Sequence, residues 1–170
     1  MAKDFITEPA GIFQDWLAVS PLTTAVAAPH PVNTRVKTRK GRILLFGKAG
    51  EATTKDLLCV LDDDGLWKLV TKALADEFHP TFGVACATAA INKYLWFCIE
   101  QVEGDATDAE LGLTTAGAVV VHAEVYTSGT AGKVDDVTTS QTKIRGINFR
   151  TAPAGAEVEY DVVYANIRTT

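Results

Sequence analysis

From residue 35 onward, short apolar runs alternate with polar, turn-forming stretches, a pattern typical of β-rich proteins. The turns between the later runs are rich in Gly, Ser, Thr and Pro. Many short strands at close spacing favour two packed sheets or a closed sheet. We therefore expect an all-β fold with an antiparallel β-barrel or β-sandwich body. The expected strands cover residues 35–39, 43–46, 57–61, 66–70, 82–88, 94–102, 117–126, 133–137, 143–149 and 157–167.

The clearest turn lies between the runs 57–61 and 66–70. It reads Asp62-Asp63-Asp64-Gly65, with Asp-Gly at its end. Because Asp and Gly tolerate the positive φ angles of tight turns, this stretch predicts a β-hairpin. Residues 71–78 are expected to form a short helical turn or a loop.

The first third of the chain follows a different pattern. Apolar residues at Ile12, Phe13, Trp16 and Leu17 fall on one helical stripe, and Pro9 suits a first helical turn, so we expect a short helix over about 9–19. Residues 20–34 hold three prolines and many Ala, Thr and Val, which favour extended backbone. A stretch of this length without its own core pattern is either disordered or held by a partner.

Charge separates the same two regions. Residues 16–50 contain no acidic residue but six basic ones, which leaves ten basic against all 21 acidic residues elsewhere. Arg35, Lys37 and Arg39 alternate with Val36 and Thr38, which predicts a strand with one basic face. We therefore divide the chain into an N-terminal arm, residues 1–40, with the helix, the Pro-rich linker and the start of the basic strand, and a β-rich body, residues 41–170.

The sequence offers no catalytic or metal-binding signature. The three histidines are scattered, and the three cysteines form no C-x-x-C pair, so we expect each thiol to be a small core residue. Gly41–Ala49 lacks the spacing of a phosphate loop, and Asp62–Gly65 lacks the distant Glu of a calcium loop. We expect neither enzyme activity nor a cofactor or metal. No apolar run is long enough to cross a bilayer, so no membrane partner is expected.

Three interpretations of the basic stretch 35–42 are open: a solvated strand face, a nucleic-acid contact, or a protein-docking surface. A net charge of −5 and the lack of interleaved aromatic residues argue against nucleic acid. Docking on an acidic protein surface, of a partner or of a neighbouring copy, is our preferred interpretation. The apolar stripe of the N-terminal helix either folds onto its own core or anchors in a partner's groove.

Two stretches carry a resemblance to a known family. The run Phe82–Ala87, followed by a turn and Leu95–Ile99, resembles the closing strand pair of tailed-bacteriophage head decoration (capsid cement) proteins. The block Gly117–Tyr126, Thr130–Val134 and Ile144–Ile147 is similar to a block in the same phage structural proteins. The likeness covers residues 47–167 in pattern and consists of generic hairpin phrases, and the long N-terminal region departs from it.

The resemblance implies a structural virion protein that binds the outer surface of the phage capsid, after synthesis in the host bacterial cytoplasm. Its partner would be the major capsid protein, and the copies would form a homo-oligomer, by analogy a trimer. A phage tail or fibre component, or a carbohydrate-binding β module with exposed aromatics such as Trp67, is the alternative. The partner-binding residues that we expect in the arm are Phe5, Ile12, Phe13, Trp16, Leu17, Arg35, Lys37, Arg39, Lys40 and Arg42.

Overall fold

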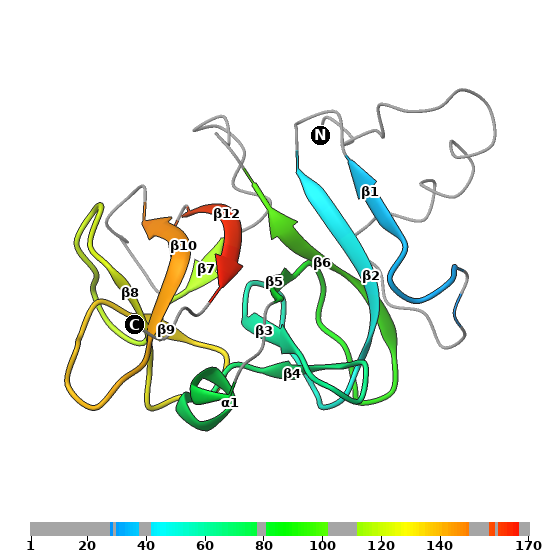
Figure 1. Cartoon of the computed structure of the whole chain (residues 1–170), viewed down its shortest axis with the longest axis horizontal. Coiled ribbons are helices and arrows are strands. Elements are labelled where there is room, and N and C mark those ends of the chain that lie inside the picture. The colour runs from blue at the N-terminus through cyan, green and yellow to red at the C-terminus, as the bar shows by residue number, and fades with distance from the viewer. Residues whose placement is uncertain are drawn as a thin grey trace.

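The structure, a computed structural model, describes residues 28, 30–37, 42–77, 81–101 and 112–149, and the backbone of 157–158 and 160–166. These residues are mostly β, as the sequence predicted, with one short helix, α1 (Lys72–Asp76), where a helical turn or a loop was expected (Figure 1). The side chain of Thr71 caps α1 by accepting a hydrogen bond from the Leu74 N–H at 3.2 Å. The helix expected over 9–19 lies outside the described residues.

The first sheet holds six strands in the order β1-β2-β4-β3-β5-β6, and β2 also pairs with β6. Five of the strands therefore pair in a closed ring, β2-β4-β3-β5-β6-β2, and β1 adds to β2 beside it. The strands are β1 (Arg35–Lys37), β2 (Ile43–Ala49), β3 (Leu58–Leu61), β4 (Leu66–Leu69), β5 (Phe82–Ala85) and β6 (Tyr94–Glu100).

The predicted hairpin is confirmed by the antiparallel pair β3–β4. Gly65 has a φ of +76°, and its N–H donates to the Asp62 carbonyl at 2.9 Å. The Asp64 carboxylate accepts the Leu66 N–H at 3.0 Å. The acidic turn thus satisfies its own backbone, as Asp and Gly in tight turns commonly do.

The expectation of a purely antiparallel body is wrong at one strand pair. β2 and β4 run parallel, with Lys48 opposite Leu66 and Ala49 opposite Trp67. The number of strands in the closed ring explains this parallel pair. Strand direction can alternate without exception only around an even number of strands, and this ring has five. Closure therefore requires at least one parallel pair.

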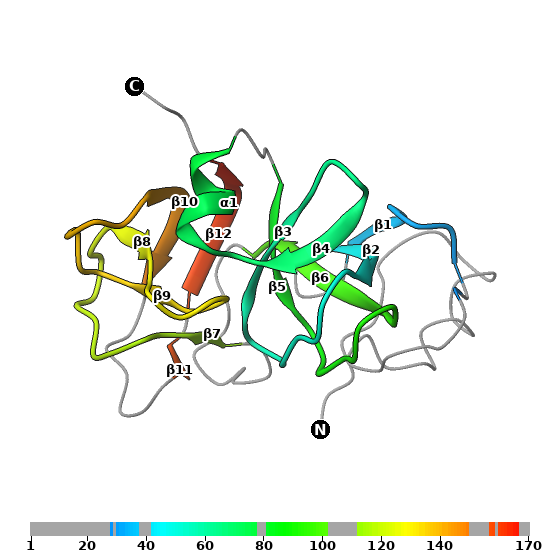
Figure 2. The ribbon, with the colours of Figure 1, turned by 90° about the horizontal axis from the view of Figure 1, so that it is seen from below.

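The second half of the chain forms a four-stranded sheet in the order β12-β10-β8-β9 and a two-stranded pair β11-β7 (Figure 2). The strand expected over 117–126 is wrong, because most of that stretch is irregular and a strand begins only at Val125. Within it, His122 has a φ of +62°, which interrupts an extended chain. The strands are β7 (Leu113–Thr114), β8 (Val125–Thr127), β9 (Val134–Asp135), β10 (Lys143–Phe149), β11 (Glu157–Val158) and β12 (Tyr160–Asn166).

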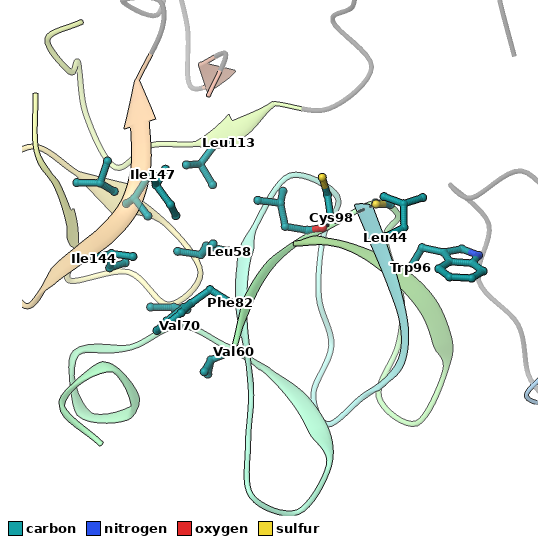
Figure 3. Close-up of a cluster of buried hydrophobic side chains, with 14 of the residues drawn as sticks. Leu44, Leu58, Val60, Val70, Phe82, Trp96, Cys98, Leu113, Ile144 and Ile147 are labelled. Carbon is teal, nitrogen blue, oxygen red and sulfur yellow. Dashed lines mark hydrogen bonds between the residues drawn. The ribbon is translucent and has the colours of Figure 1, made fainter. Parts of the chain in front are cut away.

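Within the described part of the chain, two buried clusters make up the core. The smaller one joins Trp67 and Phe97, whose rings stack at 4.1 Å, to Cys59, Ala49 and Leu95. The larger one passes from the first sheet to the second and so joins the two halves of the body (Figure 3). Its members include Leu44, Leu58, Val60, Phe82, Trp96 and Cys98 from the first sheet and Leu113, Ile144 and Ile147 from the second half.

Candidate functional site

The basic strand predicted from the sequence is present in β1. Its side chains alternate exposed, buried, exposed, with Arg35 and Lys37 outward and Val36 in the core. One edge of β1 pairs with β2, placing Arg35 opposite Leu45 and Lys37 opposite Ile43. Because Val36 fixes which face points inward, the two cations are held on the outer face by the fold itself.

Half-buried aliphatic side chains lie beside these cations. Residues directly opposite each other on paired strands project to the same face, so Arg35 stands next to Leu45 and Lys37 next to Ile43. Leu45 and Ile43 are both partly exposed, and Leu45 packs against the smaller core cluster. We call these four residues the β1 surface. It combines two cations with an aliphatic floor, which suits an acidic protein segment that carries an apolar anchor.

Among the residues that the structure describes, Glu100 places a carboxylate beside this region. The Arg35 guanidinium is 3.5 Å from the Glu100 carboxylate, and the Arg35 side chain is still 47% exposed. An exposed ion pair of this length contributes little to stability, since water competes for both charges. Arg35 can therefore exchange Glu100 for a partner's carboxylate at small cost.

Arg42 occupies a different environment. It is 3% exposed, and its Nε donates to the Gln101 Oε1 at 2.9 Å. A guanidinium that is removed from water needs such partners to offset desolvation. Arg42 therefore supports the interior and does not share the exposed surface of Arg35 and Lys37. The other residues expected at the partner site, Phe5, Ile12, Phe13, Trp16, Leu17, Arg39 and Lys40, lie outside the described residues.

The last part of the Pro-rich stretch packs on the chain's own body. The Asn33 N–H donates to the Phe46 carbonyl at 2.8 Å, and the Phe46 N–H donates to the Thr34 carbonyl at 2.9 Å. The His30 ring lies edge-on against Phe46, with centroids 5.2 Å apart, and 5.8 Å from Trp96. Burial against these rings lowers the pKa of His30. Residues 30–34 thus pack on the first sheet, and residues 35–37 form a strand of it.

Nothing in the described residues resembles a reaction centre. No group of three His, Cys, Asp or Glu within them could hold a metal ion. Burial raises the pKa of the Cys59 thiol to about 12 and holds that of Cys86 well above its usual range, so neither is a nucleophile at neutral pH. Lys68 bridges Asp62 and Asp64, with 3.2 Å to Asp64. The acidic turn is therefore a self-paired surface element.

The expectation of an exposed Trp67 is wrong. Trp67 is 1% exposed and stacks on Phe97 in the smaller cluster. Among the described residues, no Trp, Tyr or Phe is exposed, although Tyr94 and Tyr126 are partly so. A sugar-binding groove of exposed aromatic rings is therefore absent from this part of the chain.

Two features of the structure were not predicted from the sequence. Asp56 is buried with a φ of +68°, and the residues of 116–121 other than Val119 are exposed, although a strand was expected from 117. For Asp56 the available signal was its residue type, since Asp tolerates left-handed backbone. For 116–121 no local signal pointed to exposure, because a short continuous apolar run such as Ala-Gly-Ala-Val-Val-Val is consistent with a buried strand.

Comparisons of the chain with protein-family models, with curated proteins and with solved structures found no match. Within the described residues, no helix has the length and apolar character needed to span a membrane. The β1 surface, with two exposed cations beside partly exposed aliphatic side chains, is the candidate functional site.

Proposed function

We propose that this chain is a structural virion protein that binds the outer surface of a phage capsid and stabilises the head by clamping neighbouring capsid subunits. Its partner is the major capsid protein, its copies form a homo-oligomer, by analogy a trimer, and it performs no catalysis. In this proposal the five-strand ring is a small β-barrel, and the residues before it form a capsid-binding arm with a short helix. The β1 surface is the observation that carries the proposal.

The charge of the β1 surface supports docking on protein. Two exposed cations of β1 sit on a chain whose net charge is −5. A phosphate backbone would be repelled by the remainder of such a chain, whereas an acidic protein patch meets the cations locally. Opposite charges speed docking and fix its register more than they add affinity.

The aliphatic side chains of the β1 surface favour a longer-lived complex than charge alone would give. Leu45 and Ile43 are half-buried in the free chain, so a partner's apolar side chain would complete their burial. Each apolar contact of this kind contributes through the area removed from water. Charge and apolar area thus combine on one rigid strand pair.

A protein that clamps capsid subunits binds multivalently, so its overall affinity depends on how many contacts it makes. A capsid presents many identical sites, and a protein that engages two sites at once gains effective concentration at the second. Each individual contact is then allowed to be weak. The shared core between the two halves of the body keeps the spacing of such contacts fixed.

The proposal is tested by reversing charge on the β1 surface. Arg35→Glu with Lys37→Glu should reduce binding to purified phage heads about tenfold or more, and raised salt should weaken wild-type binding. Binding is measured by co-sedimentation with expanded heads. The matched control is Lys93→Glu with Lys133→Glu, which changes the net charge equally outside this surface. Equal losses in both variants, or no loss in either, would overturn the assignment.

A further inference from the structure

We propose that the Asp64–Gly65 peptide, at the tip of the β3–β4 hairpin, is a site of spontaneous covalent modification at which the aspartate converts to isoaspartate. The sequence contains this single Asp-Gly step and no Asn-Gly step. Glycine in the second position favours the reaction, because a residue without a Cβ lets another group approach its backbone closely. The inference goes beyond the proposed function and does not depend on the capsid.

The reaction requires water and no other reactant. The Gly65 nitrogen attacks Cγ of the Asp64 carboxyl group, an N–Cγ bond forms, and the carboxyl hydroxyl leaves as water with the proton of the Gly65 N–H. Water then opens this cyclic imide at either carbonyl. Cleavage of the new N–Cγ bond restores aspartate, whereas cleavage of the original peptide bond leaves the chain running through Cγ as isoaspartate. The water released by ring closure equals the water consumed by ring opening.

The turn folds the Asp64 side chain back over the Gly65 peptide. The Asp64 carboxylate accepts the N–H of Leu66, two residues further along the chain, at 3.0 Å. This bond closes a ring that runs from the side chain through the Gly65 backbone, as Asp side chains in turns commonly do. The carboxyl group is therefore kept near the Gly65 nitrogen, which lowers the entropic cost of bringing the two into contact.

The surroundings leave room for both steps of the reaction. A Cβ built at Gly65 would meet nothing within 4 Å, so the space beside its backbone is open. The Asp64 side chain is 48% exposed, so water reaches it. Lys68 lies 3.2 Å from the Asp64 carboxylate and is itself partly exposed, and such a pair holds a carboxylate only weakly.

One contact of the native turn opposes the reaction. The Gly65 N–H donates to the Asp62 carbonyl at 2.9 Å, which occupies the attacking nitrogen. The nitrogen becomes available when the turn opens, and an exposed hairpin tip opens at a lower free energy than the core strands do. Conversion should therefore be slow, over days to weeks, and should not require global unfolding.

Conversion would alter the hairpin that contains it. Isoaspartate adds Cβ to the main chain and leaves the α-carboxyl as a side group, so the Leu66 N–H and Lys68 lose an acceptor in its native place. A longer turn also disfavours the native register of β3 and β4, because turn length fixes the register of a hairpin. The converted protein should therefore unfold at a lower urea concentration than the unconverted protein.

The test is incubation of the full chain at neutral pH and physiological temperature in water labelled with a heavy oxygen isotope, followed by peptide mass spectrometry. Isoaspartate should form at Asp64 with uptake of label, about tenfold or more in excess over Asp63, which lies in the same turn but precedes another aspartate. Asp64→Glu keeps the charge and should form none, because its longer side chain closes a ring far more slowly.

A second variant tests the role of the glycine. Gly65 has a φ of +76°, and Gly65→Asn keeps a residue that tolerates this backbone while adding a Cβ beside the attacking nitrogen. It should slow conversion of Asp64 about threefold or more. Circular dichroism before and after incubation checks that each variant, and the wild type, stays folded.

Three outcomes would overturn the inference: no more conversion at Asp64 than at Asp63 in wild type, conversion without uptake of label, or an equal rate in Gly65→Asn. Conversion confined to protein that circular dichroism shows to be unfolded would also contradict it, because local opening of the turn should suffice. Capsid docking is measured separately. Asp64→Glu should bind phage heads as wild type does, so a loss of head binding in Arg35→Glu with Lys37→Glu concerns the β1 surface alone.

Discussion

Trp67 and Gly47 depend on each other at the centre of the first sheet. A Cβ added at Gly47 would lie 2.1 Å from the Trp67 Nε1 and 2.3 Å from its Cδ1, far inside van der Waals contact. The same indole stacks on Phe97, so it cannot move away freely. Within the described residues, its Nε1 is also the one buried side-chain polar atom without a hydrogen-bond partner. Glycine at this position is what allows a full indole to occupy the core.

Gly47→Ala should therefore destabilise the protein by about 1–3 kcal/mol, the usual cost of overpacking a core. Gly→Ala on unstrained backbone usually has the opposite effect: it stabilises a protein by about 0.4–1 kcal/mol, because it lowers the entropy of the unfolded chain. Urea unfolding measures the difference in free energy.

Gly117 and Gly129 provide matched controls, because a Cβ at either would meet nothing within 4 Å. Their alanine variants should unfold at or above the wild-type midpoint. In a double-mutant cycle, Trp67→Val should reduce the penalty of Gly47→Ala, because valine lacks both the Nε1 and the Cδ1 that the added Cβ would meet. Strict additivity would show that the indole is not the obstacle.

At the scale of elements, Asp56 connects three segments just before β3. Its N–H donates to the Ala85 carbonyl at 2.9 Å, and its carbonyl accepts the Thr114 N–H at 2.8 Å. Its carboxylate accepts the Gly112 N–H at 3.0 Å. β7 is thus fixed to the first sheet by both the backbone and the side chain of one residue.

Asp56→Ala should cost about 2–4 kcal/mol, since it leaves the Gly112 N–H without this acceptor and forces alanine into left-handed backbone. Asp56→Asn should cost clearly less, because asparagine tolerates that backbone and keeps an acceptor oxygen. Thermal or urea unfolding compares the two variants. Equal losses of stability in the two variants would mean that the negative charge of Asp56 stabilises the protein and that its role as a hydrogen-bond acceptor does not.

The sequence predicted elements well where local chemistry decides the structure. The hairpin at 62–65 was predicted because Asp and Gly settle the turn without help from distant residues. The run 117–126 was mispredicted because β-branched residues favour a strand on propensity alone, while tertiary contacts decide whether a partner strand exists. There the partner, β10, pairs only with the end of the run, at Val125 and Tyr126.

For the candidate site, the sequence predicted the alternation over 35–37 but not the burial of Arg42. Alternation is a local property of extended backbone, whereas the burial of Arg42 depends on Gln101, which lies far along the chain. The ring and its parallel pair were likewise beyond local patterns, because closure depends on which distant strands meet.

At the scale of the whole molecule, the thiols report on how the two halves unfold. Cys86 and Cys98 belong to the cluster shared by both sheets, and Cys59 to the smaller cluster within the first. All three are free and buried. Because burial raises the pKa of Cys59 to about 12, little thiolate exists there at pH 8 even when a reagent approaches.

Native protein at pH 8 should therefore resist iodoacetamide at all three cysteines. In rising urea the three should become reactive over one transition, since a shared core makes the body a cooperative unit. Mass spectrometry of the alkylated peptides measures each site, with fully denatured protein as the reference. A thiol modified well before the others would reveal a part of the body that opens independently.

The closed ring also has a consequence for synthesis on the ribosome. Nearly the whole length of one edge of β2 pairs with β6, from Ile43 opposite Glu100 to Lys48 opposite Tyr94. That edge has no partner in the nascent chain until β6 has emerged, and pairings so distant in sequence are slow to form. A ribosome that stalled between the two strands would present an unpaired apolar strand to chaperones and to other nascent chains.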